Sequence, residues 1–309
     1  MVVDGRVADV DTLATHKLVR MRVAAASHPG ATAAVLARLA GDSSRNVRRV
    51  VGARPETAVK ALQRLATDPD RATREAVAGN TSTPPDTLIS LLSDRDFDVR
   101  YAATTNPAAD LRVQRAMCAS PVSDVRGVLA QRPGLPPEIV GLLVQDPHRQ
   151  VRETIAHSVD LPAVLQTLLD DPNPAVRATA AQNPHTTAAQ RRQLTRDPAA
   201  QVRASVVHAM ARHGWNIAEE DLLRLAADRS LNVRFWVANL PGSTRPVYET
   251  LAEDPDDQIA VSARQWLQKP AGPRHTSGRH RFSNPAQLGR PILEIENHVW
   301  NQYMNRGSS

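Results

Sequence analysis

The sequence predicts an all-α solenoid of about nine to ten copies of a 26-residue helical pair. The first observation is a row of arginines spaced by 26, 26, 26, 26, 26, 25, 26 and 31 residues: Arg22, Arg48, Arg74, Arg100, Arg126, Arg152, Arg177, Arg203 and Arg234. A tenth copy follows the same spacing but has Ala260 in place of the arginine. The second observation is an aspartate six residues before these positions in eight of the ten copies: Asp42, Asp68, Asp94, Asp146, Asp171, Asp197, Asp228 and Asp254. A fixed period of about 20 to 50 residues is typical of a solenoid, whose units bury their apolar faces against their neighbours. No segment alternates apolar and polar residues between hairpin turns, so we expect almost no strand.

One copy, residues 68–93, shows why each part of the repeat should be helical. Asp68 is expected to be a helix N-cap, with Pro69 at the first helical position, where the missing N–H costs nothing. Gly79-Asn80 should end this helix, since both residues tolerate the left-handed conformation. Thr83 should cap a second helix. The apolar residues of the two helices recur at helical spacing: Ala72, Ala76 and Val77, then Leu88, Leu91 and Leu92.

The recurring Arg and Asp residues are predicted to stabilise the stack rather than to bind a ligand. Six residues separate them, which is too far for a pair on one helix face. A guanidinium can instead reach the aspartate or the free carbonyls of an adjacent copy and form a ladder along the stack. A phosphate-binding row of arginines would not need the aspartates.

The full motif reads D-P-x-x-x-V-R-x-x-x-A-x-N-P followed by T-x-x-x-L-x-x-L, as in residues 171–194 and 94–117. It resembles the leucine-rich repeat variant, a relative of HEAT repeats in bacteria, over about residues 16–268. The resemblance implies a right-handed superhelix of paired short helices, some of the 3₁₀ type. One member of that family carries an iron–sulfur cluster on an N-terminal cysteine cluster. Cys118 is the only cysteine here, so we predict no cofactor.

Composition divides the chain into four segments. Residues 1–15 are expected to be a lead-in and residues 16–268 the repeat solenoid. Residues 269–291 are rich in Pro, Gly, Ser, Arg and His and are expected to be a basic linker. Residues 292–309 should contain an amphipathic helix, which docks either on the end of the solenoid or on a partner.

Charge gives only weak support for a nucleic-acid partner. The net charge of +6 and the pI of about 10.2 suggest one. However, residues 270–309 hold five Lys and Arg against two Asp and Glu, which leaves a net charge of +3 for residues 1–269. The chain has no stretch of 18 apolar residues and no signal-like start, and its single cysteine suits a reducing compartment. We therefore expect a cytoplasmic protein that does not contact membranes.

Our leading hypothesis is a non-enzymatic scaffold that binds a protein partner through its concave face and its C-terminal aromatic region. Eight of the ten aromatic residues lie after position 210, and aromatic residues together with arginine are typical of interaction hot spots. Because Phe235 and Trp236 are adjacent on a helix, at least one of them should lie near the surface. The expected partner-binding residues are Arg212, His213, Trp215, Trp236, Trp300 and Tyr303.

The second hypothesis is a DNA- or RNA-binding solenoid that uses charge alone to hold phosphates. Its candidate residues come from the N-terminal half and the basic linker: Arg45, Arg49, Arg54, Arg64, Arg71, Arg95, Arg279 and Arg281. The third is a HEAT-like DNA glycosylase, which requires a deep pocket near Trp215 with a buried carboxylate from Glu219, Glu220 or Asp221. Acidic residues are ordinary at a helix start, so we assign no catalytic residue. No histidine spacing indicates a metal site, and the oligomeric state stays open.

Overall fold

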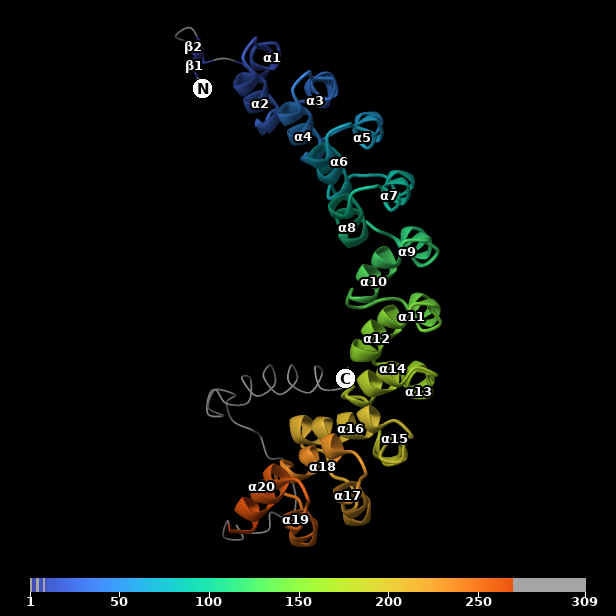
Figure 1. Cartoon of the computed structure of the whole chain (residues 1–309). Helices are drawn as coiled ribbons and strands as arrows, with labels where there is room; N and C mark the ends of the chain where they lie inside the picture. The colour runs from blue at the N-terminus through green and yellow to red at the C-terminus, as the bar shows by residue number, and fades with distance from the viewer. Residues whose placement is uncertain (1, 4–5, 8, 269–309) are drawn as a thin grey trace.

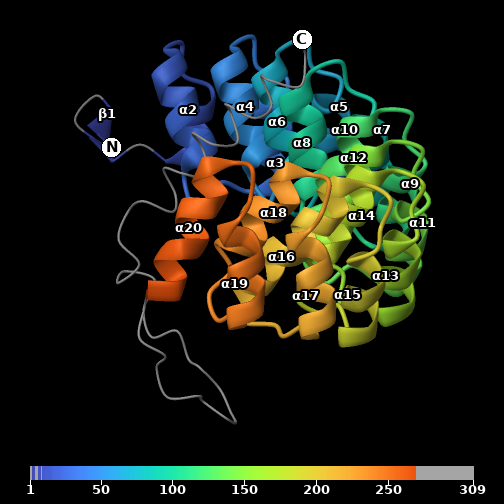
Figure 2. The same cartoon turned by 60° about the horizontal axis from the view of Figure 1, so that its bottom comes forward.

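The computed structural model describes residues 2–3, 6–7 and 9–268. Helices follow one another in pairs along an arc, with the odd-numbered helices on the convex side and the even-numbered helices on the concave side (Figure 1). In Figure 2 the same helices surround a common centre, while Figure 1 separates α2 from α20 along the stack, so the helices wind as a superhelix. The prediction of an all-α solenoid is confirmed.

The described residues contain ten helix pairs. The convex helices are α1 (Val10–Ala14), α3 (Ala33–Leu39), α5 (Val59–Leu65), α7 (Pro85–Leu91), α9 (Leu111–Cys118), α11 (Pro137–Leu143), α13 (Pro162–Leu169), α15 (Ala188–Leu194), α17 (Glu219–Ala226) and α19 (Arg245–Ala252). The concave helices are α2 (Val19–Ser27), α4 (Arg45–Ala53), α6 (Arg71–Ala78), α8 (Phe97–Thr105), α10 (Ser123–Ala130), α12 (Arg149–Ser158), α14 (Pro174–Ala181), α16 (Ala200–His213), α18 (Leu231–Ala238) and α20 (Asp257–Gln268). The strands β1 (Val2–Val3) and β2 (Arg6–Val7) form an antiparallel hairpin and are the only strands in the described part of the chain.

The core is linear and runs between the two layers of helices. Convex helices contribute leucines such as Leu62 and Leu88, and concave helices contribute small residues such as Val77 and Ala103, all fully buried. Each concave helix packs on the next one, as α4 does on α6 and α6 on α8. Small side chains at these contacts allow the helices to approach closely. The buried apolar residues of the whole stack form one continuous cluster.

The loop before each concave helix is longer than the sequence predicts. Helix α6 begins at Arg71 and its N-cap is Asp70, whose side chain accepts a hydrogen bond from the Thr73 amide at 3.0 Å. The prediction that Asp68 is the N-cap is wrong, because its carboxylate accepts hydrogen bonds from Arg48 and from the Asp70 amide. Asp68 therefore shapes the turn and contacts the preceding copy.

The loop after the concave helix also differs. Gly79 has a φ of −82°, so the helix ends in a right-handed conformation and not in the expected left-handed one. Thr83 is not the N-cap of α7, because Pro84 occupies the N-cap position. The Thr83 hydroxyl instead donates to the Val77 carbonyl at 2.6 Å and closes the loop.

The N-terminal boundary and the helix type also differ from the expectations. Helix α1 lies within the expected lead-in and is the convex partner of α2, with Leu13 and Ala14 buried. The Asp-to-Arg signature marks only the loop and the concave helix, so it gives no sign of a convex helix ahead of the first copy. All of the described helices are α-helices, and none is of the 3₁₀ type that the resemblance implied. Segments 269–291 and 292–309 lie outside the described residues.

The five-residue insertion before Arg234 lengthens a helix. Helix α16 has 14 residues and ends at Gly214, whose φ of 66° gives a left-handed C-cap. Glycine adopts this conformation without steric cost. Within the described residues, no helix combines the length and the apolar character needed to cross a membrane.

Candidate partner-binding surface

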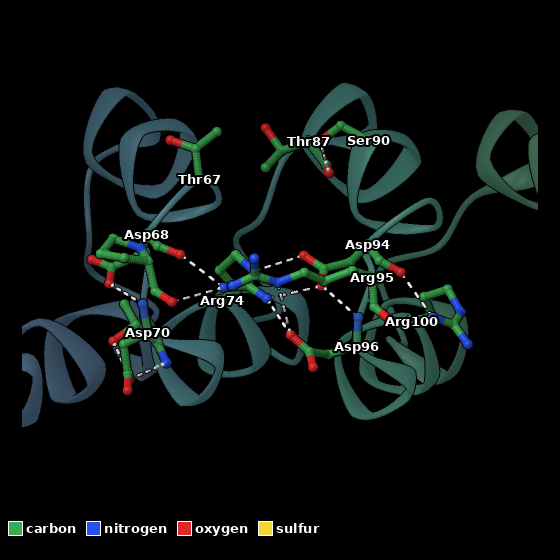
Figure 3. Close-up of polar contacts among 12 residues, drawn as sticks. Thr67, Asp68, Asp70, Arg74, Thr87, Ser90, Asp94, Arg95, Asp96 and Arg100 are labelled. Carbon is green, nitrogen blue, oxygen red and sulfur yellow. Dashed lines mark hydrogen bonds and ion pairs between the residues drawn. The ribbon is translucent and has the colours of Figure 1, made fainter.

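A ladder of Arg–Asp pairs runs along the edge where the concave helices begin. Arg74 donates through Nε and Nη2 to the carboxylate of Asp94 in the next copy, at 2.7 and 3.0 Å. Its Nη1 donates to the Asp68 carbonyl in its own copy at 2.8 Å, and its Nη2 also reaches Asp96 (Figure 3). The same pairing joins Arg22–Asp42, Arg48–Asp68, Arg126–Asp146, Arg152–Asp171, Arg177–Asp197, Arg203–Asp228 and Arg234–Asp254. The predicted ladder is confirmed, and its arginines bind carboxylates and carbonyls of the chain itself.

Hydrogen bonds in the ladder favour the charged forms of Asp42, Asp94 and Arg74. Burial favours the neutral form of Asp94, but the hydrogen bonds from Arg74 and from the Asp96 amide outweigh it and lower the pKa of Asp94 below its ordinary value of 3.8. The pKa of the Asp42 carboxyl is lowered chiefly by its hydrogen bond from Arg22. The hydrogen bond to Asp94 raises the pKa of Arg74. These side chains therefore stay charged over the physiological pH range.

At each end of the ladder, another residue replaces the aspartate or arginine that would need a partner in a further copy. His16 stands where an aspartate would require a preceding arginine, and its carbonyl still accepts a hydrogen bond from Arg22 at 2.9 Å. Ala260 stands where an arginine would require a following aspartate. Neither terminal copy leaves a ladder group without its partner.

A second row of hydrogen bonds lies at the opposite edge, where the concave helices end. Asn106 Nδ2 donates to the carbonyls of Ala78 and Asn80 in the preceding copy, at 2.6 and 2.9 Å. Asn80 and Asn183 donate to the preceding copy in the same way. Two arginines replace asparagine in this row. Arg54 Nη1 donates to the carbonyls of Ala26 and His28. Arg132 Nη1 donates to the carbonyls of Thr104 and Asn106.

The six described arginines among those proposed for nucleic acid are not brought together as a group. Arg45, Arg49 and Arg71 lie on the concave helices α4 and α6 and are exposed. Arg71 pairs with Asp98, and Arg45 lies 3.9 Å from Asp70. The other described members lie elsewhere: Arg54 at the edge, Arg64 on convex α5, and Arg95 in the loop before α8, 3.5 Å from Asp96. Arg279 and Arg281 lie outside the described residues.

The C-terminal aromatic region is packed partly against its own chain. The Trp215 ring is half-buried, with the guanidinium of Arg191 4.3 Å from its centroid and the His213 ring stacked at 4.5 Å. His213 Nε2 also lies 3.2 Å from the Gln182 carbonyl. Arg212 is exposed at the end of α16. Trp215 therefore fixes the lengthened α16 against the neighbouring copy.

Trp236 lies on the concave helix α18, with its ring centroid 4.7 Å from that of His208 on α16. Phe235 meets the same ring edge-on at 5.9 Å. Phe235 and Trp236 are both half-buried, so each of them presents part of its ring at the surface. Trp300 and Tyr303 lie outside the described residues.

Asp221 is fully buried and is surrounded by arginines. Arg192, Arg196 and Arg224 lie 3.1, 3.0 and 2.7 Å from its carboxylate oxygens. The three guanidinium groups stabilise the buried carboxylate. Asp221 therefore has a structural role between α15 and α17. A groove of about 800 Å³ lies between the copies at residues 169–198, and neither Asp221 nor Trp215 lines it. The described residues contain no cluster of His, Cys, Asp and Glu that could hold a metal ion.

An exposed aromatic pair on α8 was missed by the sequence analysis. Phe97 and Tyr101 are one helical turn apart, are 51% and 48% exposed, and have ring centroids 5.9 Å apart. They lie on the face of α8 opposite to the buried Val99 and Ala103, and α8 belongs to the concave row of helices. The equivalent positions are charged on the two preceding concave helices, with Arg45 and Arg49 on α4 and Arg71 and Glu75 on α6. We call Phe97, Tyr101, Arg45, Arg49 and Arg71 the concave patch.

Several solved structures are similar to the chain. One, described as a leucine-rich repeat variant with a novel repetitive protein structural motif, is 22% identical over 75% of this chain and 80% of its own, with a TM-score of 0.45. The chain is a helical repeat solenoid similar to that variant. Two designed armadillo repeat proteins, one of them made for modular peptide recognition, are 14% and 15% identical and cover 75% of this chain and 97% of their own, with TM-scores of 0.26 and 0.23. No protein-family model matches the chain, and no curated protein matches it. The architecture rests on the helix pairs described above.

Proposed function

We propose that this chain is a non-enzymatic scaffold that binds a protein partner along the concave face of its solenoid. The observation that carries the proposal is the aromatic pair Phe97 and Tyr101, which is half exposed although aromatic side chains are rare in this chain. Aromatic side chains exposed together are typical of interaction sites. The recurring polar groups serve the stack, which leaves the concave surface free for recognition.

Charge on the concave face favours a protein over a nucleic acid. A continuous phosphate backbone is bound by uncompensated positive charge. Arg71 is paired with Asp98, and Glu75 lies on the same surface of α6. On α4, Arg45 and Arg49 present positive charge with little compensation. A mixed surface of this kind suits the varied side chains of a protein.

The aromatic region of α16 and α18 supplies a second contact area in this proposal. Trp236 and His208 lie on the adjacent concave helices α18 and α16, and Arg212 and His213 lie at the end of α16. A partner that follows the concave surface reaches both areas. We place this interaction in the cytoplasm, where a lone cysteine such as Cys118 remains reduced.

Two glycines allow a matched test of which face binds. Gly127 lies on concave α10 and Gly141 on convex α11, and an added Cβ would meet no atom within 4 Å at either position. A photo-crosslinking amino acid is placed at one site or the other in the full chain, which is then irradiated in native lysate. We expect protein adducts that resist nuclease from position 127 and few from position 141. Adducts from 141 alone, or nuclease-sensitive adducts from 127, would contradict the proposal.

A further inference from the structure

We infer that the partner segment recognised by the concave patch is an extended acidic peptide with one large apolar side chain. The apolar side chain packs on Phe97 and Tyr101, and its carboxylates pair with Arg45 and Arg49. This inference rests on the proposed function and adds the chemistry of the partner. It follows from the exposure of the aromatic rings, from the charge of α4, and from the distance between them.

The aromatic half of the patch is accessible and pre-formed. The two rings are tilted by 30° and share one face of α8. The Arg100 guanidinium lies 5.9 Å from the Phe97 centroid and holds one side of that ring. Arg100 itself is held by Asp124, so the ring has a fixed neighbour. A leucine or aromatic side chain of the partner can cover both rings without displacing a contact of the fold.

The charged half of the patch lies on α4. Arg45 and Arg49 are one turn apart and exposed, and the Arg45 side chain is 74% exposed. The nearest carboxylate to Arg45 is that of Asp70 at 3.9 Å, and Arg49 makes no ion pair with the described residues. No acidic residue occurs in α4. Two adjacent guanidinium groups of this kind bind carboxylates in bidentate geometry.

The spacing between the two halves sets the length of the motif. Packed helices lie about 8–10 Å apart, and α6 separates α4 from α8, so the two halves are about 16–20 Å apart. An extended chain advances about 3.3 Å per residue. The carboxylates of the partner should therefore lie about five or six residues from its apolar anchor.

Acidic residues around the aromatic pair distinguish a peptide from a nucleic acid. Asp98 lies on α8 beside Phe97 and compensates Arg71, Asp124 on α10 compensates Arg100, and Glu75 lies on α6. A phosphate chain that stacked its bases on Phe97 and Tyr101 would bring its charges towards these carboxylates. A peptide can place its acidic residues at α4 and neutral residues at α6 and α8.

The test is a selection from a random 16-residue peptide display library on the full-length chain, followed by fluorescence anisotropy of the selected peptides. We expect Asp or Glu about five or six residues from a leucine or an aromatic residue. Arg45→Glu/Arg49→Glu and Phe97→Ala/Tyr101→Ala should each weaken binding by about tenfold or more. The convex substitutions Arg64→Glu and Leu142→Ala should leave binding within about twofold.

The possible failures are distinguishable. Selected peptides without acidic residues, or with binding unchanged by Arg45→Glu/Arg49→Glu, would overturn the inference. If binding depends on Trp236 instead of Phe97, the inference fails and the scaffold proposal stands. If no selected peptide depends on any concave residue, both fail. A 20-nucleotide single-stranded DNA or RNA probe is tested in the same way. If it binds tightly and the Phe97→Ala/Tyr101→Ala variant does not bind it, the partner of the concave patch is a nucleic acid and the inference fails.

Discussion

Arg100 is held by Asp124, with its Nη2 2.5 Å from the Asp124 Oδ2, because Ser120 stands where eight of the ten copies have an aspartate. Asp124 lies four residues further on, in the first turn of α10. Arg100 keeps its second anchor, since Nη1 donates to the Asp94 carbonyl at 2.8 Å. The ladder thus tolerates a missing member when a nearby carboxylate can take its place.

The first prediction is that Asp124→Ala lowers the free energy of unfolding by about 2–4 kcal/mol, because it leaves a largely buried Arg100 guanidinium without a counter-charge. Adding Ser120→Asp in the same chain should recover most of the loss by restoring the ladder position. Urea unfolding followed by circular dichroism measures both. A loss no larger than that of the exposed control Gln131→Ala, or no rescue by Ser120→Asp, would count against this role.

The second prediction concerns acid. The pKa values of Asp42, Asp68, Asp94, Asp228 and Asp254 are lowered in the folded chain. The unfolded chain therefore binds protons first as the pH falls, and the stability that these groups contribute is complete above their ordinary pKa of about 3.8 and is lost below it. Thermal unfolding midpoints should change little from pH 7 to pH 5 on account of these groups and fall steeply from pH 4 to pH 2. A flat profile below pH 4 would show that the ladder does not act through ionised carboxylates.

The third prediction concerns the second edge of the stack. Asn106→Ala removes two hydrogen bonds to buried carbonyls and should cost about 2–4 kcal/mol. Asn106→Arg should cost less, because Arg132 bonds carbonyls from the same place in the next copy. Chemical unfolding of the two variants gives the comparison, and equal losses would show that arginine cannot replace asparagine in this row.

The fourth prediction separates recognition from folding at the concave patch. Phe97→Ala and Tyr101→Ala should each change the free energy of unfolding by less than about 0.5 kcal/mol, since both rings are exposed on one side. Leu88→Ala, in the core, should cost about 2–5 kcal/mol. The comparison uses thermal unfolding of the three variants. A large loss for Tyr101→Ala would mean that its ring is needed by the fold.

The sequence predicted the stack and the Arg–Asp ladder because both depend on residues that recur at a fixed register. The pairing of Arg74 with the following copy could be inferred because six residues are too many for a pair within one helix. The cap positions were predicted wrongly. Aspartate is a favoured N-cap residue, but the Asp68 carboxylate accepts a hydrogen bond from Arg48. Only the folded stack brings these two side chains together.

The second hydrogen-bond row and the concave patch were not predicted. The Asn106 side chain donates to carbonyls 26 and 28 residues earlier, and no local sequence pattern shows such a contact. Phe97 and Tyr101 could have been found by comparing copies, since they occupy two surface positions one turn apart that are charged on α4 and α6.

The residues at the two ends of the ladder also bear on self-association. An aspartate at position 16 and an arginine at position 260 would give each molecule two complementary half-pairs at opposite ends. Head-to-tail contacts of that kind join molecules into rings when the rotation closes and into filaments when it does not. With His16 and Ala260 in these places, the Arg–Asp pairing that joins one copy to the next inside the molecule provides no such contact between molecules.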